Sequence, residues 1–161
     1  MQVHLLRHGT AEDITPAGSD AERRLTAVGR DEVRRAAECA RRARVAPTLF
    51  MSSPYVRAVE TAEIAAEVLG YGGSIVRTDL LIPPASPQRV WNEIRSRQDE
   101  MQILLAAHEP LLSQLASYLL NSPALQIAMR KATLVRIDLD RFAPDPRGIL
   151  KWMGPPELWA G

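Results

Sequence analysis

Two histidines and two arginines are the residues of this sequence best suited to chemistry on a phosphoryl group. Arg7 and His8 follow the apolar run 3–6, and Arg57 and His108 each come shortly after a later apolar run. A guanidinium presents a planar fork of donors that matches phosphate oxygens, and a neutral imidazole is a nucleophile near pH 7. The set predicts phosphoryl transfer through a phosphorylated histidine. Such a reaction needs no metal, cofactor or nucleotide-binding loop, and we expect none.

The local context of each residue suggests its role. His8 stands between an arginine and the turn-forming Gly9, so we expect its imidazole to attack phosphorus. His108 is expected to act as an imidazolium that donates to the transferring group. Arg7 and Arg57 are expected to hold the nonbridging oxygens and to compensate charge as it shifts in the transition state.

The chain is predicted to deliver these residues to one place by alternating strands and helices. Strands are expected at 3–6, 47–52, 74–77, 102–107, 133–139 and 148–153, and helices from 26 to about 43, from 53 to 69, from 88 to 97 and from 111 to 120. In the strand expected at 102–107, every residue after Gln102 is apolar, which is typical of a central strand buried on both faces. This pattern predicts an α/β fold with a mainly parallel sheet, helices on both faces and antiparallel strands near the carboxyl end.

Local signals place the starts of two helices. Thr26 is the expected N-cap of the first helix, and Ser53 followed by Pro54 is the expected start of the second. Arg57 then lies in the first turn of its helix and can reach over the sheet edge that carries His8. The hydroxyls of Thr10 and Ser53 have two interpretations: each either binds phosphate or serves only in a turn or a helix cap.

Composition limits the classes of partner. The chain has 161 residues, so one domain over 1–161 is expected, and its net charge of +1 argues against bulk binding to nucleic acid or membranes. The single cysteine, Cys39, suits a reducing compartment. No signal peptide and no apolar run of membrane-spanning length is apparent. We therefore expect a cytoplasmic protein.

Three stretches in the same order resemble the histidine phosphatase superfamily, which has the phosphoglycerate mutase-like fold. They are 6–9 (LRHG), 52–62 (SSPYVRAVETA) and 107–110 (AHEP), and the size and spacing are most similar to SixA-type phosphohistidine phosphatases. The resemblance covers nearly the whole chain. It implies a three-layer α/β/α fold, a transiently phosphorylated His8, and a phosphate pocket completed by Arg7, Arg57 and His108. It also implies that the partner is a signalling or phosphocarrier protein that bears phosphohistidine.

One departure from the larger relatives bears on the substrate. Those relatives place a carboxylic acid after the third strand to protonate a leaving alkoxide, whereas 80–85 (LLIPPA) holds no carboxylate. A phosphorylated imidazole needs no such acid, because its other nitrogen can be protonated from solvent. The departure favours a P–N substrate, although Asp79 or Glu12 could still supply a proton. A phosphomonoesterase of the same fold and a phosphoprotein-binding module without turnover are the alternatives.

Overall fold

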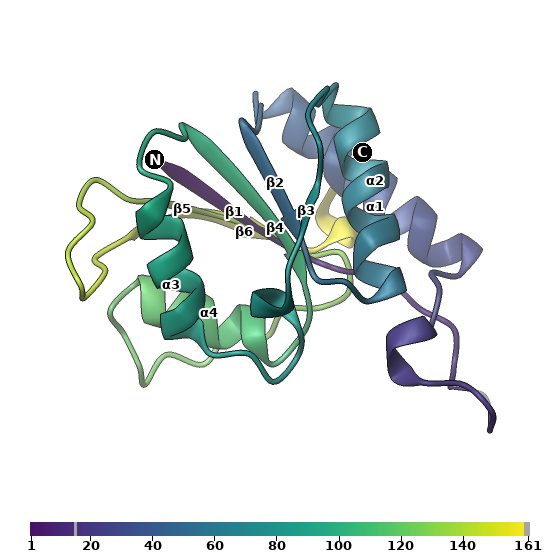
Figure 1. Cartoon of the computed structure of the whole chain (residues 1–161). Coiled ribbons are helices and arrows are strands. Elements are labelled where there is room, and N and C mark those ends of the chain that lie inside the picture. Colours follow the sequence, from purple (N-terminus) through teal and green to yellow (C-terminus); the bar gives the residue numbers. More distant parts are fainter. Residues whose placement is uncertain (15, 160–161) are drawn as a thin grey trace.

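A six-stranded sheet forms the middle layer of the molecule, with its strands in the order β3-β2-β4-β1-β5-β6 (Figure 1). The strands are β1 (Gln2–Arg7), β2 (Leu49–Ser52), β3 (Val76–Arg77), β4 (Gln102–Ala107), β5 (Leu134–Asp138) and β6 (Ile149–Gly154). The helices are α1 (Ala27–Arg42), α2 (Val56–Leu69), α3 (Pro87–Ser96) and α4 (Leu111–Leu119), with 3-10 helices η1 (Asp20–Glu22), η2 (Asp79–Leu81) and η3 (Pro156–Trp159).

The computed structural model describes residues 1–14 and 16–159. Residue 15 and the last two residues of the domain predicted over 1–161 therefore lie outside the described residues. In the described part, no helix is both long and apolar enough to cross a membrane.

The register of the sheet aligns the ends of the two strands that precede the histidines. β4 is central and runs parallel to both β1 and β2, with Arg7 opposite Ala107. His8 and His108 therefore leave neighbouring strands at the same edge. β5 is antiparallel to β1 and to β6. This confirms the predicted sheet, parallel in its first part and antiparallel near the carboxyl end.

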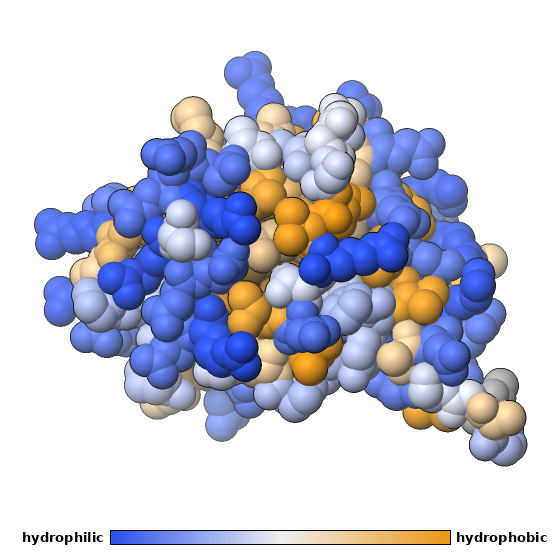
Figure 2. Space-filling model, viewed as in Figure 1, coloured by the Kyte–Doolittle hydropathy of each residue, from blue (hydrophilic) through white to orange (hydrophobic). Residues whose placement is uncertain are grey.

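Alternate residues of the strands face two separate apolar cores, as the period of a strand requires. Leu5 and Leu105 pack in the core on the side of α3 and α4, where Trp91 is fully buried. Leu6 and Leu104 pack in the other core, on the side of α1 and α2. The predicted three layers are thus confirmed (Figure 1). On the face shown in Figure 2, hydrophilic side chains cover most of the surface and apolar ones show mainly toward its centre.

The helix signals were right at one start and wrong at the other. The Thr26 hydroxyl accepts a hydrogen bond from the Gly29 N–H at 3.0 Å, so Thr26 caps α1 as predicted. Ser53 does not cap α2, which begins at Val56 after Tyr55. The reason is that Ser53 is fully buried and its hydroxyl lies against His108, in the candidate site. A tertiary contact has replaced the cap.

The turn after His8 is pressed against the start of α1. A Cβ added to Gly9 would overlap the backbone of Gly29, and one added to Gly29 would overlap that of Thr10. The Thr26 N–H also donates to the Thr10 carbonyl at 2.9 Å. The two glycines thus allow α1 to hold the turn that follows His8 in a fixed position.

Candidate active site

The structure brings Arg57 and both histidines into one buried cluster at the carboxyl edge of the sheet. His8 is 3% exposed, Arg57 is 4% exposed and His108 is 1% exposed. The centroids of the two imidazole rings are 5.1 Å apart, and Arg57 Nε lies 3.2 Å from His8 Nε2. Arg7 precedes His8 and is electrostatically coupled to Arg57 and His108. Three of the four residues that the sequence predicted for the pocket are therefore in contact, and Arg7 lies next to His8 in the chain.

The hydrogen bonds of His8 define which ring nitrogen is available for attack. Its Nδ1 lies 2.7 Å from the Gly9 carbonyl, an acceptor, so Nδ1 carries the proton and donates. Nε2 keeps a lone pair, toward which the Arg57 Nε–H donates. Burial, opposed by the bond to Gly9 and assisted by nearby Lys131, His108 and Arg57, lowers the pKa of His8 from 6.5 to about 2. His8 is therefore a neutral imidazole at physiological pH, the form that a nucleophile requires.

His108 differs from its expected protonation state. Its Nε2 lies 2.8 Å from Ser53 Oγ, and Tyr55 packs edge-on at 5.0 Å between ring centroids. Burial, then the charge of Arg57, lowers the pKa of His108 from 6.5 to about 3. The free protein thus holds a neutral His108 and not the predicted imidazolium. An incoming phosphoryl dianion opposes both causes, so His108 would gain its proton together with the substrate.

Arg57 has a carboxylate partner that the sequence did not indicate. Its NH1 donates to the Asp20 carbonyl at 2.6 Å and its NH2 to the Asp20 carboxylate at 3.0 Å. Although burial opposes it, hydrogen bonds from Arg23 and Arg57 lower the pKa of Asp20. Asp20 is therefore ionised at neutral pH and is a poor proton donor. It belongs to η1, in a polar stretch between β1 and α1 where the sequence shows no periodic pattern.

Arg7 is anchored by one of its donors. Its NH1 donates to the Met129 carbonyl at 2.5 Å, while its buried Nε has no hydrogen-bond partner among the described residues. Burial is the main cause that lowers the pKa of Arg7. A buried donor without a partner is costly, so an anion at this place would stabilise the site.

The two candidate hydroxyls have different surroundings. The Thr10 hydroxyl donates to Glu32 at 3.0 Å and its N–H donates to the same carboxylate at 2.8 Å, so the single hydroxyl proton is already committed to α1. This does not support Thr10 as a phosphate ligand. The Ser53 hydroxyl instead holds the His108 ring and accepts from the Tyr55 N–H at 3.3 Å. It is placed to orient His108.

The two carboxylates considered as proton donors are exposed. Asp79 begins η2 and Glu12 lies in the loop after β1. Glu109, next to His108, accepts from the Ser113 N–H at 2.9 Å at the start of α4. Asp20 is thus the carboxylate that is hydrogen-bonded to the cluster, while the charge of Glu109 acts on Arg7. Within residues 1–14 and 16–159, no group of three or more His, Cys, Asp or Glu side chains could hold a metal ion.

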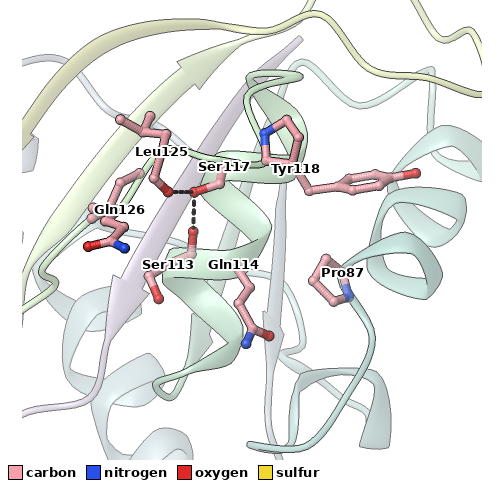
Figure 3. A pocket seen from close by; sticks show the side chains of 9 residues that line it. Pro87, Ser113, Gln114, Ser117, Tyr118, Leu125 and Gln126 are labelled. Atoms are coloured by element: carbon pink, nitrogen blue, oxygen red, sulfur yellow. Dashed lines mark hydrogen bonds between the residues drawn. The ribbon is translucent and has the colours of Figure 1, made fainter.

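A cavity of about 370 Å³ lies apart from the histidines, between the start of α3, the middle of α4 and the segment that follows α4 (Figure 3). It is lined by Pro87, Ser113, Gln114, Ser117, Tyr118, Pro123, Leu125, Gln126 and Ile127. The Ser117 hydroxyl donates its hydrogen bond toward the carbonyl oxygens of Ser113 and Leu125. The lining has no charged side chain, so this cavity is not suited to phosphoryl chemistry.

Solved structures with this fold include several phosphatases. The protein histidine phosphatase SixA, solved with tungstate, is 26% identical with a TM-score of 0.88, over 98% of this chain and 99% of SixA. A SixA protein of Agrobacterium tumefaciens is 23% identical with a TM-score of 0.82, over 95% and 96% of the two chains. A mycobacterial glucosyl-3-phosphoglycerate phosphatase is 19% identical with a TM-score of 0.70, over 93% and 96%.

The sequence itself matches a family model. The model of the histidine phosphatase superfamily (branch 1) matches residues 3–82, which include Arg7, His8 and Arg57. The chain belongs to the histidine phosphatase superfamily. It has the phosphoglycerate mutase-like fold of that superfamily and is a phosphatase. None of the curated protein sequences matches it.

The buried histidines of this histidine phosphatase should make its stability depend on pH. Burial is the main cause that lowers the pKa values of His4, His8 and His108, to about 4, 2 and 3, from 6.5. As pH falls below 6.5, the unfolded chain gains protons that the folded chain does not. The free energy of unfolding is therefore greatest above pH 6.5 and declines toward pH 4. We expect the free energy of unfolding to fall by about 1 kcal/mol per pH unit for each histidine.

Urea unfolding at pH 7.5, 6.5, 5.5 and 4.5 measures this decline. His4→Leu removes one buried histidine in the middle of β1, and it should flatten the slope by about a third because three histidines share it. Equal unfolding free energies of the wild type at pH 6.5 and 4.5 would contradict the expectation.

Proposed function

We propose that this histidine phosphatase hydrolyses phosphohistidine on a protein, through a phosphoryl group carried transiently by His8. The observation that carries the proposal is the His8 ring itself: Nδ1 donates to Gly9 and leaves the Nε2 lone pair facing Arg57. Arg57, Arg7 and His108 surround the position at which a tetrahedral anion would be attacked. Similarity to the protein histidine phosphatase SixA supports the assignment.

The first step transfers the phosphoryl group from the substrate to the enzyme. The Nε2 lone pair of His8 forms a bond to phosphorus as the P–N bond of the substrate breaks, and Arg7 and Arg57 compensate the charge on the equatorial oxygens. The other ring nitrogen of the substrate imidazole, protonated from solvent, lets that ring leave as neutral imidazole. No protein group has to protonate the leaving nitrogen.

The second step returns the enzyme to its starting state. A water oxygen bonds to phosphorus as the P–Nε2 bond breaks, the proton of the water passes to solvent or phosphate, and inorganic phosphate and neutral His8 result. The low pKa of His8, caused by burial, favours its departure as a neutral ring. Proton transfer to an alkoxide, which ester hydrolysis requires, is worth about 10²–10⁴ in rate. Asp20, held ionised by Arg23 and Arg57, is poorly suited to that task.

The partner that follows from this proposal is a signalling or phosphocarrier protein that carries phosphohistidine, in the cytoplasm. A reducing compartment agrees with the single free cysteine, Cys39. The competing candidate is a phosphomonoesterase, because a glucosyl-3-phosphoglycerate phosphatase shares the fold.

The experiment compares two classes of substrate on the same enzyme preparation. We expect kcat/KM for a phosphohistidine peptide to exceed that for sugar phosphates by about 10²-fold or more, because only the esters need a proton donor. Release of inorganic phosphate is measured, with the His8→Ala variant as the blank. Equal kcat/KM values for the two classes would establish the esterase instead, and binding of the peptide without phosphate release would establish a binding module.

A further inference from the structure

The segment immediately before β5 wraps around the turn that carries Arg7 and His8. The Ala132 N–H donates to the His8 carbonyl at 3.1 Å, and the Arg7 N–H donates to the Thr133 carbonyl at 3.0 Å. On the other side, Arg7 NH1 donates to the Met129 carbonyl. Residue 131 is thus flanked by backbone groups that bind directly to the catalytic turn. The backbone at residue 131 is therefore held beside this turn.

The residue at this position is Lys131, which is partly buried. Its ammonium group forms no hydrogen bond or ion pair within the described part of the chain. Its electrostatic neighbours come from four elements: Arg7 at the end of β1, Arg23 in the loop before α1, Arg57 on α2 and Glu32 on α1. Three of these four are cations. The Glu32 carboxylate already accepts both donors of Thr10.

The next residue back shows that this arrangement is specific to position 131. Arg130 is 70% exposed and pairs with Glu157 at 3.4 Å. Arg130 therefore has a carboxylate beside it to balance its charge, whereas three of the four charges that act on Lys131 are guanidinium groups. Like charges gathered in a partly buried place raise the energy of the free protein, and an anion in their midst lowers it.

We propose that Lys131 is a further catalytic residue, whose ammonium group contacts the phosphoryl oxygens together with Arg7 and Arg57. The inference rests on the proposed function, since it names a third cation of the same phosphate pocket. A lysine ammonium is a compact point charge on a flexible stem, so it can follow the oxygens as phosphorus moves from the substrate to His8. Its charge also helps to keep His8 neutral, because burial and the Lys131 ammonium both lower the pKa of His8.

The test measures binding of an anion and turnover separately. Vanadate, a tetrahedral oxyanion, is titrated against the wild type and against Lys131→Met, Lys131→Arg and Arg130→Met, and kcat/KM is measured with phosphoramidate. We expect Lys131→Met to weaken vanadate binding about 10-fold and to lower kcat/KM by about 10²-fold, with most of both restored in Lys131→Arg. Arg130→Met, which removes the same charge one residue away, should stay within about 2-fold of the wild type.

A pH profile adds a readout that a structural role would not move. Burial, then the charges of Arg7, Arg23 and Arg57, lowers the pKa of Lys131 from 10.5, with Glu32 opposing. The wild type should therefore lose activity on the alkaline side below pH 10.5, and Lys131→Arg should keep its activity there.

The outcomes separate the two proposals. Wild-type vanadate affinity and turnover in Lys131→Met would overturn the role of Lys131 and leave the proposed function standing, as would an equal loss in Arg130→Met. Failure of the wild type to bind vanadate would overturn the phosphate pocket itself. If Lys131→Met does not fold, Lys131→Gln and the alkaline limb of Lys131→Arg decide the matter.

Discussion

Replacing His8 by alanine is expected to lower kcat/KM for a phosphohistidine peptide by about 10⁴-fold or more, because it removes the atom that bonds to phosphorus. The other imidazole of the cluster is held differently: His108 Nε2 lies 2.8 Å from Ser53 Oγ, and its buried Nδ1 has no partner among the described residues to fix its tautomer as Gly9 does for His8. Incubation with ³²P-labelled phosphohistidine should leave an acid-labile label on the wild type after a rapid quench. The same incubation should leave no label on His8→Ala.

His108→Ala is the matched control for this experiment. It removes a buried imidazole from the same cluster but not the proposed nucleophile, so it should lower the rate and still become labelled. A label that survives in His8→Ala and disappears in His108→Ala would show that the two roles are reversed. Near-wild-type turnover by His8→Ala would contradict covalent catalysis at His8.

The architecture was predictable because it depends on the periods of apolar residues. The apolar side chains of the segment that forms β4 point to both faces of the sheet, so they are all buried only if the strand is central. The strand is indeed buried almost throughout. The meeting of His8 and His108 followed from the same pattern, since the ends of adjacent parallel strands share one edge. Arg57 was placed correctly because the first turn of a helix after β2 returns to that edge.

The parts of the site that were missed depend on tertiary contacts and on burial. Ser53 has the composition of an N-cap, and only the fold shows that its hydroxyl is taken by His108. Asp20 lies in a loop without a periodic pattern, and its bond to Arg57 spans 37 residues. Lys131 precedes a strand and has no motif around it. The protonation of His108 could not be read from the sequence, because burial sets its pKa.

Arg57 should be important for activity and nearly dispensable for stability. Its guanidinium is 4% exposed, yet its carboxylate partner Asp20 is 43% exposed and its other charged neighbours include Arg7 and Lys131. Arg57→Met leaves Asp20 without its partner, but that carboxylate is exposed enough to be hydrated, and the repulsion between Arg57 and its cationic neighbours is relieved. We therefore expect Arg57→Met to change the free energy of unfolding by less than about 1 kcal/mol.

The same substitution should lower kcat/KM by about 10³-fold, since an arginine that stabilises a transferring phosphoryl group is commonly worth that much or more. Unfolding in urea and phosphate release are measured on one preparation, with Arg35→Met as control, because Arg35 pairs with Asp31 on the exposed face of α1. That control should leave both quantities near their wild-type values. A large loss of stability in Arg57→Met, with activity lost in proportion to the folded fraction, would make Arg57 a structural residue. Retained stability with lost turnover would show that Arg57, buried beside other cations, is needed to bind the phosphoryl anion and not to hold the fold.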